Sequence, residues 1–510
     1  MRRIFDSLFS RIAIVGLLIF IQLIILIIGI WKLSESFVYL YVFFFIISVL
    51  VVIYIVSRTD NPSYKLAWTI PVLLFPVFGG LFYLLFGGKK INNNFKRKII
   101  RVYYEFKGAL IQDPMIIREL EEQDKSIANQ AKYTSKYADS PVYKNTLTEY
   151  LSPGEKFYER LVEELKKAEK YIFMEYFIVH EGKMWDNILN ILEEKAKQGV
   201  DVRMIYDDMG CLTTLPYKYN EELEKRGIKC KVFNPFVPFL SIILNNRDHR
   251  KITVIDGHTA FTGGINLADE YINEIVRFGH WKDSSIMIKG EAVWNLTIMF
   301  LQIWSFNSGE NIDYNDFRFP KDKFKFESDG YVQPYADSPL DDEIVGENVY
   351  LNIINKAEDY VYICTPYLII DNELVTALTL AAKSGVDVRI ITPHIEDKWY
   401  AHIVTKAYYP QLIKAGVKIY EYTPGFIHSK TVVSDDKVGT VGTINFDYRS
   451  LYLHFECGVW LYKTSSINAI KEDYINTLKV CTEITLEDCK HVKVYNRILT
   501  AIFRVFAPLM

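Results

Sequence analysis

The sequence lacks the short motifs with which many enzymes bind nucleotides or metal ions. It contains no GxGxxG or P-loop pattern, and the glycine pair at 263–264 stands alone, so no nucleotide loop is indicated. It has no HExxH motif and no clustered carboxylates, so we expect no metal ion and no cofactor. The six cysteines are scattered without short-spaced pairs. That spacing argues against a cysteine-based zinc site or a disulfide framework and fits a reducing compartment.

A large net charge is also missing. The 510 residues include 59 Lys and Arg and 62 Asp and Glu, a net charge of −3, so the whole chain is not a polyanion binder. The region that carries the motifs described below has no strong basic excess, and we expect no nucleic-acid partner. The length is sufficient for two or three domains.

Long apolar runs are present at the N-terminus. Residues 12–31 and 37–56 each form 20 residues without a charge, enough to cross about 30 Å of hydrocarbon as a helix. The first run is too long for a signal peptide and lacks a small-residue cleavage site. We therefore expect two transmembrane helices within residues 1–60.

A third apolar run, residues 66–86, is interrupted by two prolines and a glycine pair, which favours an interfacial or re-entrant segment over 61–88. Arginines precede the first span, and residues 89–101 are basic. The positive-inside rule places both on the cytoplasmic side of the cell membrane, as in a multi-pass protein whose remaining chain is cytoplasmic. The basic run opens a linker, residues 89–140, and either contacts an anionic membrane, at about 1 kcal/mol per residue, or is a solvated helix.

From about residue 140 the pattern alternates between strands and helices. Residues 166–208 and 355–394 each read strand, helix and strand, and both contain GVDVR after a predicted helix. This pattern predicts an α/β fold with a largely parallel sheet. We expect a duplicated α/β/α unit with pseudo-twofold symmetry, residues 141–330 and 331–490, joined near 326–345.

Two matched motifs support the duplication. DHRKITVID (248–256) and IHSKTVVSD (427–435) have histidine, lysine and aspartate at the same positions. With a glycine and an asparagine further along, the matched residues stand at offsets of +2, +7, +14 and +17 from the histidine. The repeated residues are His249, Lys251, Asp256, Gly263 and Asn266, and then His428, Lys430, Asp435, Gly442 and Asn445.

Alternation along a strand separates these side chains. Residues two apart face the same side, so each histidine points with its lysine, and the aspartate seven positions on points away. We predict that Asp256 and Asp435 belong to the catalytic motifs but fix the backbone or neighbouring side chains.

Two His/Lys pairs in one site suit phosphodiester chemistry. One imidazole attacks phosphorus, the other protonates the leaving alkoxide, and the lysines stabilise the developing charge. We predict that Asn266 and Asn445 donate hydrogen bonds to the phosphate. A nucleophilic imidazole needs an acceptor for its other nitrogen, and Asp283 and Glu456, at equivalent places in the next strand, are predicted to supply it.

The paired HxKxxxxD motifs resemble those of the phospholipase D superfamily. The stretches at 245–271 and 424–456, with the apolar segment at 61–87, resemble bacterial cardiolipin synthases. The resemblance implies transfer of a phosphatidyl group between two phosphatidylglycerol molecules through a phosphohistidine, releasing glycerol. It assigns the nucleophile to His249 and the acid/base to His428, although the pseudosymmetry leaves the order open. His454 and Lys282 depart from the family pattern, where asparagine and arginine are usual.

Alternatives follow from the same residues. The chain fits a hydrolase of this superfamily, a transferase with another donor or acceptor lipid, or an inactive membrane scaffold. The intact motifs speak against the scaffold. An amphipathic C-terminal helix, residues 491–510, is predicted either to lie in the headgroup layer or to pack on the protein core.

Overall fold

The computed structural model describes residues 38–75, 93–236, 246–320, 330–341, 343–490 and 494–509, with a few isolated positions elsewhere. The first predicted membrane span, residues 12–31, lies outside this set apart from three positions.

The elements of the first half, with the helices that precede it, come first along the chain. They are α3 (Val38–Ser57), α4 (Pro62–Leu74), α6 (Asn93–Glu105), α7 (Pro114–Gln123), α8 (Lys125–Tyr137), β1 (Thr146–Leu151), α9 (Gly154–Lys166), β2 (Tyr171–Tyr176), α10 (Lys183–Lys197), β3 (Asp201–Asp207), α11 (Tyr219–Lys225), β4 (Lys229–Phe233), β5 (Lys251–Ile255), β6 (Thr259–Gly263), β7 (His280–Lys282), β8 (Ser285–Gly290) and α12 (Val293–Ser308).

The second half follows and ends with the C-terminal helix. Its elements are β9 (Tyr331–Asp337), α13 (Val345–Lys356), β10 (Tyr360–Cys364), β11 (Leu368–Ile369), α14 (Asn372–Lys383), β12 (Asp387–Pro393), α15 (Trp399–Lys414), β13 (Lys418–Tyr422), β14 (Gly425–Ile427), β15 (Thr431–Ser434), β16 (Val438–Gly442), β17 (Phe446–Asp447), α16 (Tyr448–Tyr452), β18 (Glu456–Tyr462), α17 (Ser465–Leu478), β19 (Cys481–Ile484) and α18 (Val494–Phe506).

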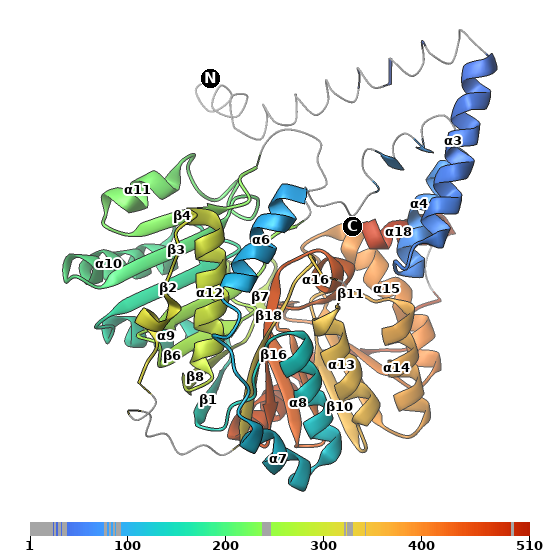
Figure 1. The fold of residues 1–510 in the computed structure, drawn as a ribbon. Coiled ribbons are helices and arrows are strands. Elements are labelled where there is room, and N and C mark those ends of the chain that lie inside the picture. Colours follow the sequence, from blue (N-terminus) through green and yellow to red (C-terminus); the bar gives the residue numbers. More distant parts are fainter. Residues whose placement is uncertain are drawn as a thin grey trace.

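The two halves have the same topology and lie side by side (Figure 1). The first sheet has the strand order β1-β8-β6-β5-β2-β3-β4. The second has the order β9-β18-β16-β15-β10-β12-β13, followed by one additional strand, β19. Each strand of the first sheet therefore has a counterpart in the second, and the predicted duplication of an α/β unit is confirmed.

The sheets are mixed, and the prediction of a largely parallel sheet is wrong. Within these two sheets only β2-β3-β4 and β10-β12-β13 pair in parallel, through the helix crossovers that the sequence revealed. The short pairs β11-β17 and β14-β7 are parallel as well. The strands after each histidine motif pair antiparallel. β5 and β6, like β15 and β16, are separated by only three residues, a connection that permits a hairpin but no parallel crossover.

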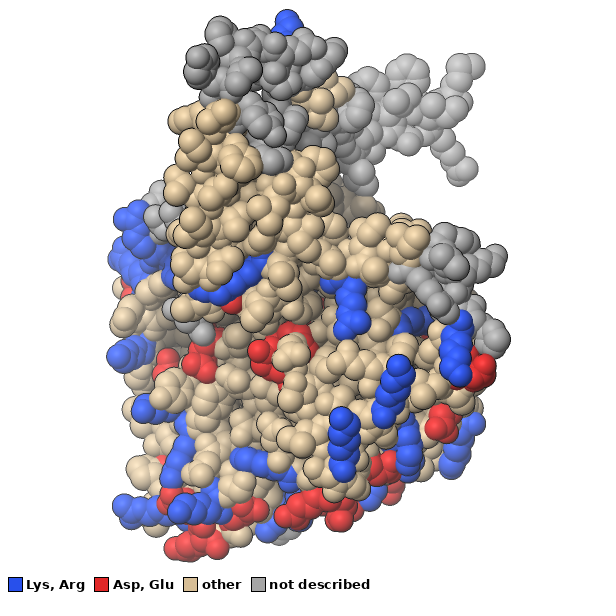
Figure 2. Space-filling model, turned by 90° about the vertical axis from the view of Figure 1, so that its right-hand side faces the viewer, with Lys and Arg blue, Asp and Glu red and all other residues tan. Residues whose placement is uncertain are grey.

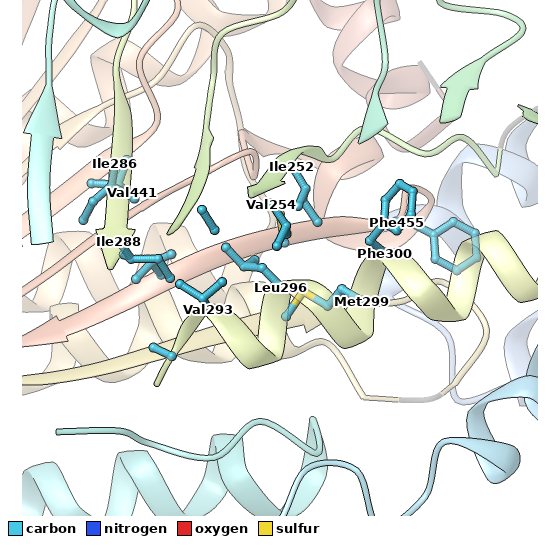
Figure 3. Close-up of a cluster of buried hydrophobic side chains, with 14 of the residues drawn as sticks. Ile252, Val254, Ile286, Ile288, Val293, Leu296, Met299, Phe300, Val441 and Phe455 are labelled. Carbon is cyan, nitrogen blue, oxygen red and sulfur yellow. The ribbon is translucent and has the colours of Figure 1, made fainter. Parts of the chain in front are cut away.

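Helices cover both faces of each sheet, and the two faces that pack against α12 and α17 share one core. In Figure 3, side chains of β5 and β8 meet α12, while Val441 and Phe455 of the second half reach the same cluster. Thirteen of the 16 residues of α12 are buried, as expected for a helix that is apolar on all sides. Hydrophobic burial thus holds the two halves together and fixes the interface in which the motifs lie.

The segment predicted as a basic linker contains helices that pack on both halves. Ile99 and Phe106 of the α6 region are buried in the shared core, whereas Ile127 and Ala131 of α8 are buried against the second half. The arginines and Lys98 of α6 remain exposed on the opposite face.

The N-terminal and C-terminal helices meet beside the second half (Figure 1). α3 is 20 residues long and carries no charged residue. Its side chains are described from Val42 onward, and among the residues described no helix is both long and apolar enough to cross a membrane. The amide of Asn61, which caps α4, donates to Asp371 and to the Tyr452 hydroxyl, and these bonds tie the N-terminal helices to the second half.

Candidate active site

Both histidine motifs lie at the interface between the halves, just before a central strand. His249 and His428 precede β5 and β15, and short main-chain ladders join each motif to the other half. The amide of His249 donates to the Phe455 carbonyl at 3.0 Å, and that of His428 donates to the Lys282 carbonyl at 2.7 Å. The two bonds are equivalent, as the pseudo-twofold symmetry between the halves requires.

Each imidazole is held by a carboxylate of the opposite half. Nδ1 of His249 lies 2.8 Å from Oε1 and 3.0 Å from Oε2 of Glu456. Nδ1 of His428 lies 2.7 Å from Oδ2 of Asp283. Both carboxylates are fully buried, so they accept the Nδ1 proton and leave Nε2 of each ring for substrate. Neither half contains a complete site.

Lys251 and Lys430 are buried beside the histidines. The ammonium group of Lys251 donates to the carbonyl oxygen of His249 at 2.5 Å, and Lys430 makes the same bond to His428. An ammonium group has three donors, so each lysine retains hydrogen atoms for a phosphate. Burial lowers the pKa of Lys251 to about 8 and that of Lys430 to about 7.

Burial and mutual charge keep the histidines neutral. Burial, followed by the charge of Lys251, lowers the pKa of His249 well below its usual value, and Lys430 and His428 of the other half act in the same direction. Burial and Lys430 lower the pKa of His428 to about 4. Charged groups of the second motif therefore act on the histidine of the first, as expected if both motifs belong to one site. Although burial disfavours its charge, neighbouring His428 and Lys430 lower the pKa of Asp283.

The motif aspartates lie away from this pocket and bind main-chain groups. Asp256 accepts hydrogen bonds from the amides of 169–171 at 2.7–2.9 Å, and Asp435 accepts them from the amides of 358–360 at 2.8–3.0 Å. Both follow the end of their strand with φ near +50° (51° and 54°), so the strand does not run straight to them. Their contacts are those expected of residues that fix the backbone.

The two asparagines already use part of their bonding capacity inside the protein. Nδ2 of Asn266 donates to the Tyr271 hydroxyl at 2.6 Å, and Oδ1 accepts from the Ile178 amide. Nδ2 of Asn445 donates to Asp447 at 3.0 Å. Each NH2 group has a second hydrogen, so the contacts leave one donor per asparagine for a phosphate.

The two half-sites differ in the rings beside the histidines. The His454 ring lies 5.5 Å from that of His249, whereas Trp281, at the equivalent position, lies 5.3 Å from His428. The second departure from the family pattern, Lys282, pairs with Asp473 of α17 at 2.7 Å.

Reasoning from sequence missed Thr443, whose hydroxyl donates to Glu456. Its counterpart is Gly264, where a Cβ atom would lie 2.1 Å from Oδ1 of Asp283. The sequence did offer a signal, because the residue after the matched glycine differs between the two copies: Gly264 in the first and Thr443 in the second.

Among the residues described, two groups of side chains could hold a metal ion, although no sequence motif indicates either group. One consists of His249, His454 and Glu456, whose potential ligand atoms lie within 4.8 Å of one another. The other brings together carboxylates from α13 and the start of α14, at positions 347, 371 and 373. The carboxylates are clustered in space but come from separate elements, which is why the sequence showed no such cluster.

Comparison with known proteins identifies the family. The sequence model described as "Cardiolipin synthase, PLD-like domain" matches residues 161–291 and 350–478, once in each half. Another, described as "Phospholipase D-nuclease N-terminal", matches residues 45–88. A cardiolipin synthase of Alkalihalophilus pseudofirmus is 35% identical over 468 residues, covering 90% of this chain and 91% of that protein. The chain belongs to the cardiolipin synthase family.

Two further matches add a relative of similar length and a likeness in fold. A Streptococcus mutans protein described as "Uncharacterized protein" is 46% identical over 466 residues, 90% of this chain and 99% of that protein. The crystal structure of a Haemophilus influenzae phosphatidylserine synthase superposes with a TM-score of 0.55 at 14% identity, covering 74% of this chain and 97% of that chain. The latter supports the fold. The predicted family and the predicted enzyme class, a phosphatidyltransferase, are confirmed.

Proposed function

We propose that this enzyme transfers a phosphatidyl group from one phosphatidylglycerol to the hydroxyl of another, producing cardiolipin and glycerol. The observation that carries the proposal is the crossed pairing of two histidines with carboxylates of the opposite halves, beside two buried lysines. This arrangement provides two imidazoles with equivalent orientation and a cationic pocket for one phosphate. The reaction needs no cofactor.

In the first step, Nε2 of His249 attacks phosphorus and displaces the glycerol oxygen, which takes a proton from Nε2 of His428. Glu456 stabilises the charge that forms on the His249 ring, and Lys251 and Lys430 stabilise the phosphate oxygens. The empty site keeps His428 neutral, with a pKa of about 4. A bound phosphate supplies negative charge that raises the pKa of His428, so that its ring is protonated and can act as the acid.

In the second step the roles reverse. His428 removes a proton from the acceptor hydroxyl, whose oxygen attacks phosphorus and breaks the bond to His249. The remaining donors of Asn266 and Asn445 hold the phosphate in both steps. Water in place of the acceptor would give phosphatidic acid, and exclusion of water therefore decides between synthase and hydrolase.

A bacterial membrane location follows from the apolar segments. We propose two membrane-spanning helices within residues 1–60, an interfacial segment over 61–88, and a cytoplasmic catalytic part of two halves, 141–330 and 331–490. In Figure 2 the described residues in the upper part of one face are mostly uncharged, whereas charged side chains crowd the lower part, and α3 carries no charged residue. Such a surface suits contact with lipid rather than water.

α18 extends the same apolar region. Its Ile498 is 59% exposed and its Ile502 is 50% exposed, while Phe503 packs on Trp399 of α15. The helix thus uses one side for the protein and presents another to the headgroup layer. α18 also contacts α4, so the C-terminal helix and the interfacial segment form one membrane-facing region.

The decisive experiment supplies the purified full-length protein with labelled phosphatidylglycerol in vesicles and separates the products by chromatography. Cardiolipin and glycerol in equal amounts support the proposal. Phosphatidic acid with glycerol would identify a hydrolase, and turnover only after addition of another lipid would identify a different donor or acceptor. Labelling of single cysteines from each side of the membrane tests the topology: residues in 32–36 should react from outside, and catalytic residues only after permeabilisation.

A further inference from the structure

The imidazole of His454 lies beside that of His249, with 5.5 Å between the ring centroids. Its side chain is 10% exposed, and neither ring nitrogen bonds to any group among the residues described. A buried polar group without a partner costs free energy, so both ring nitrogens are available to a ligand that could satisfy them.

The neighbours of this ring define the chemistry of such a ligand. Nδ1 of His454 lies 3.7 Å from Oε1 of Glu456, and Nδ1 of His249 lies 2.8 Å from the same oxygen. Two imidazoles and one carboxylate are the protein ligands of many zinc ions, with bonds of about 2.0–2.1 Å. Ligand atoms around a tetrahedral zinc ion then lie about 3.4 Å apart, and the two spacings to Oε1 of Glu456, 2.8 Å and 3.7 Å, lie on either side of that value.

The other half-site provides an internal contrast. There His428 has Trp281 as its neighbour at the equivalent position, and an indole offers no metal ligand. Of the two half-sites, as far as their residues are described, only the one around His249 therefore holds the complete set of three ligands.

We propose that His249, His454 and Glu456 form a binding site for Zn²⁺ that inhibits the enzyme. Binding replaces the Nδ1 proton of His249, which passes to solvent, and it engages the carboxylate that orients the ring. The metal charge on Nδ1 then weakens Nε2 as a nucleophile and opposes the cationic phosphohistidine. Lys251 and Lys430 lie in the same pocket and repel a cation, so we expect binding at micromolar rather than nanomolar zinc.

Binding is tested without reference to activity. Metal-free full-length protein in detergent is dialysed against zinc, and the bound metal is counted; cobalt substitution adds a visible absorption band for low-symmetry coordination. We expect one zinc per chain for the wild type and at least a tenfold weaker affinity for His454→Phe, which keeps a ring beside His249 as Trp281 does beside His428. His454→Asn provides a second, smaller variant.

His394→Phe is the matched control, because Nδ1 of His394 lies 2.9 Å from Glu421 in a His–Glu pair outside the site, and in the described part of the chain this pair belongs to no group of three potential metal ligands. Its zinc affinity should equal that of the wild type. Equal affinity of wild type and both His454 variants would overturn the proposal.

The inhibitory consequence rests on the proposed function and has its own test. Zinc is titrated into the cardiolipin-forming assay, and each variant is compared with its own rate in chelator. We expect half-inhibition of the wild type at a zinc concentration at least tenfold below that for either His454 variant, with recovery after chelation. Equal inhibition of all variants overturns the inhibitory role. Absence of cardiolipin from the zinc-free wild type contradicts the proposed function instead, and the dialysis experiment still decides whether the metal site exists.

Discussion

The two half-sites share one set of contacts, called the frame below, but differ in the residues that surround the histidine. In both, a histidine bonds to the main chain of the other half, a lysine bonds to the carbonyl of that histidine, and an aspartate binds three amides. Around His249 the frame is completed by Glu456, Thr443 and His454, and around His428 by Asp283, Gly264 and Trp281. Duplication thus supplied the geometry, and divergence around it makes separate chemical roles possible.

The largest effects should come from the histidines. Replacing His249 or His428 with alanine should each lower cardiolipin formation roughly 10⁴-fold, because the nucleophile or the proton donor is lost. A phosphatidyl ester of p-nitrophenol, whose leaving group needs no proton, separates the roles. His428→Ala should still release nitrophenol in a single burst, whereas His249→Ala should not. Equal loss with this substrate would contradict the assignment.

The orienting carboxylates test whether the crossed pairing matters. Glu456→Gln and Asp283→Asn should each lower kcat roughly 10²-fold while leaving KM nearly unchanged, because the imidazole loses the acceptor that fixes its tautomer. Steady-state kinetics with phosphatidylglycerol vesicles measure this loss. Glu421→Gln, which alters a buried carboxylate paired with a histidine outside the site, should have no effect. Full activity of Glu456→Gln or Asp283→Asn would contradict the crossed pairing of histidines and carboxylates.

The alkaline limb of the pH profile distinguishes the two lysines. Lys430 and Lys251 have pKa values of about 7 and about 8, and their charged forms are needed to hold phosphate. Because charge is lost as pH rises through these values, kcat/KM should fall by at least about tenfold between pH 7 and pH 9. Lys430→Arg should move the limb to higher pH, since a guanidinium stays charged. A wild-type profile flat to pH 9 would contradict this reading.

The smallest effect compares the motif aspartates. Asp256→Ala leaves three amides in a largely buried setting and should reduce the free energy of unfolding by about 1–3 kcal/mol. The amides bound by Asp435 are mostly exposed, so water replaces the carboxylate and Asp435→Ala should cost less. Thermal unfolding in detergent measures both, with wild type as reference. A larger loss for Asp435→Ala would reverse the comparison.

Much of this protein was predictable from the chain. The matched offsets after His249 and His428 indicated the duplication, and the HxK spacing placed each lysine with its histidine, because both features are local. The largely parallel sheet was predicted wrongly, because the alternation of strands and helices covers only the first part of each half. The antiparallel hairpins that follow carry no helix signal.

The sequence alone determined the repeat, the family and the residue types of the site, since these depend on periodicity and spacing along one chain. Tertiary structure alone decided that Glu456 serves His249 and Asp283 serves His428. Each of these pairs joins residues more than 140 positions apart, and only the packing of two sheets around a shared apolar core brings them within hydrogen-bonding distance.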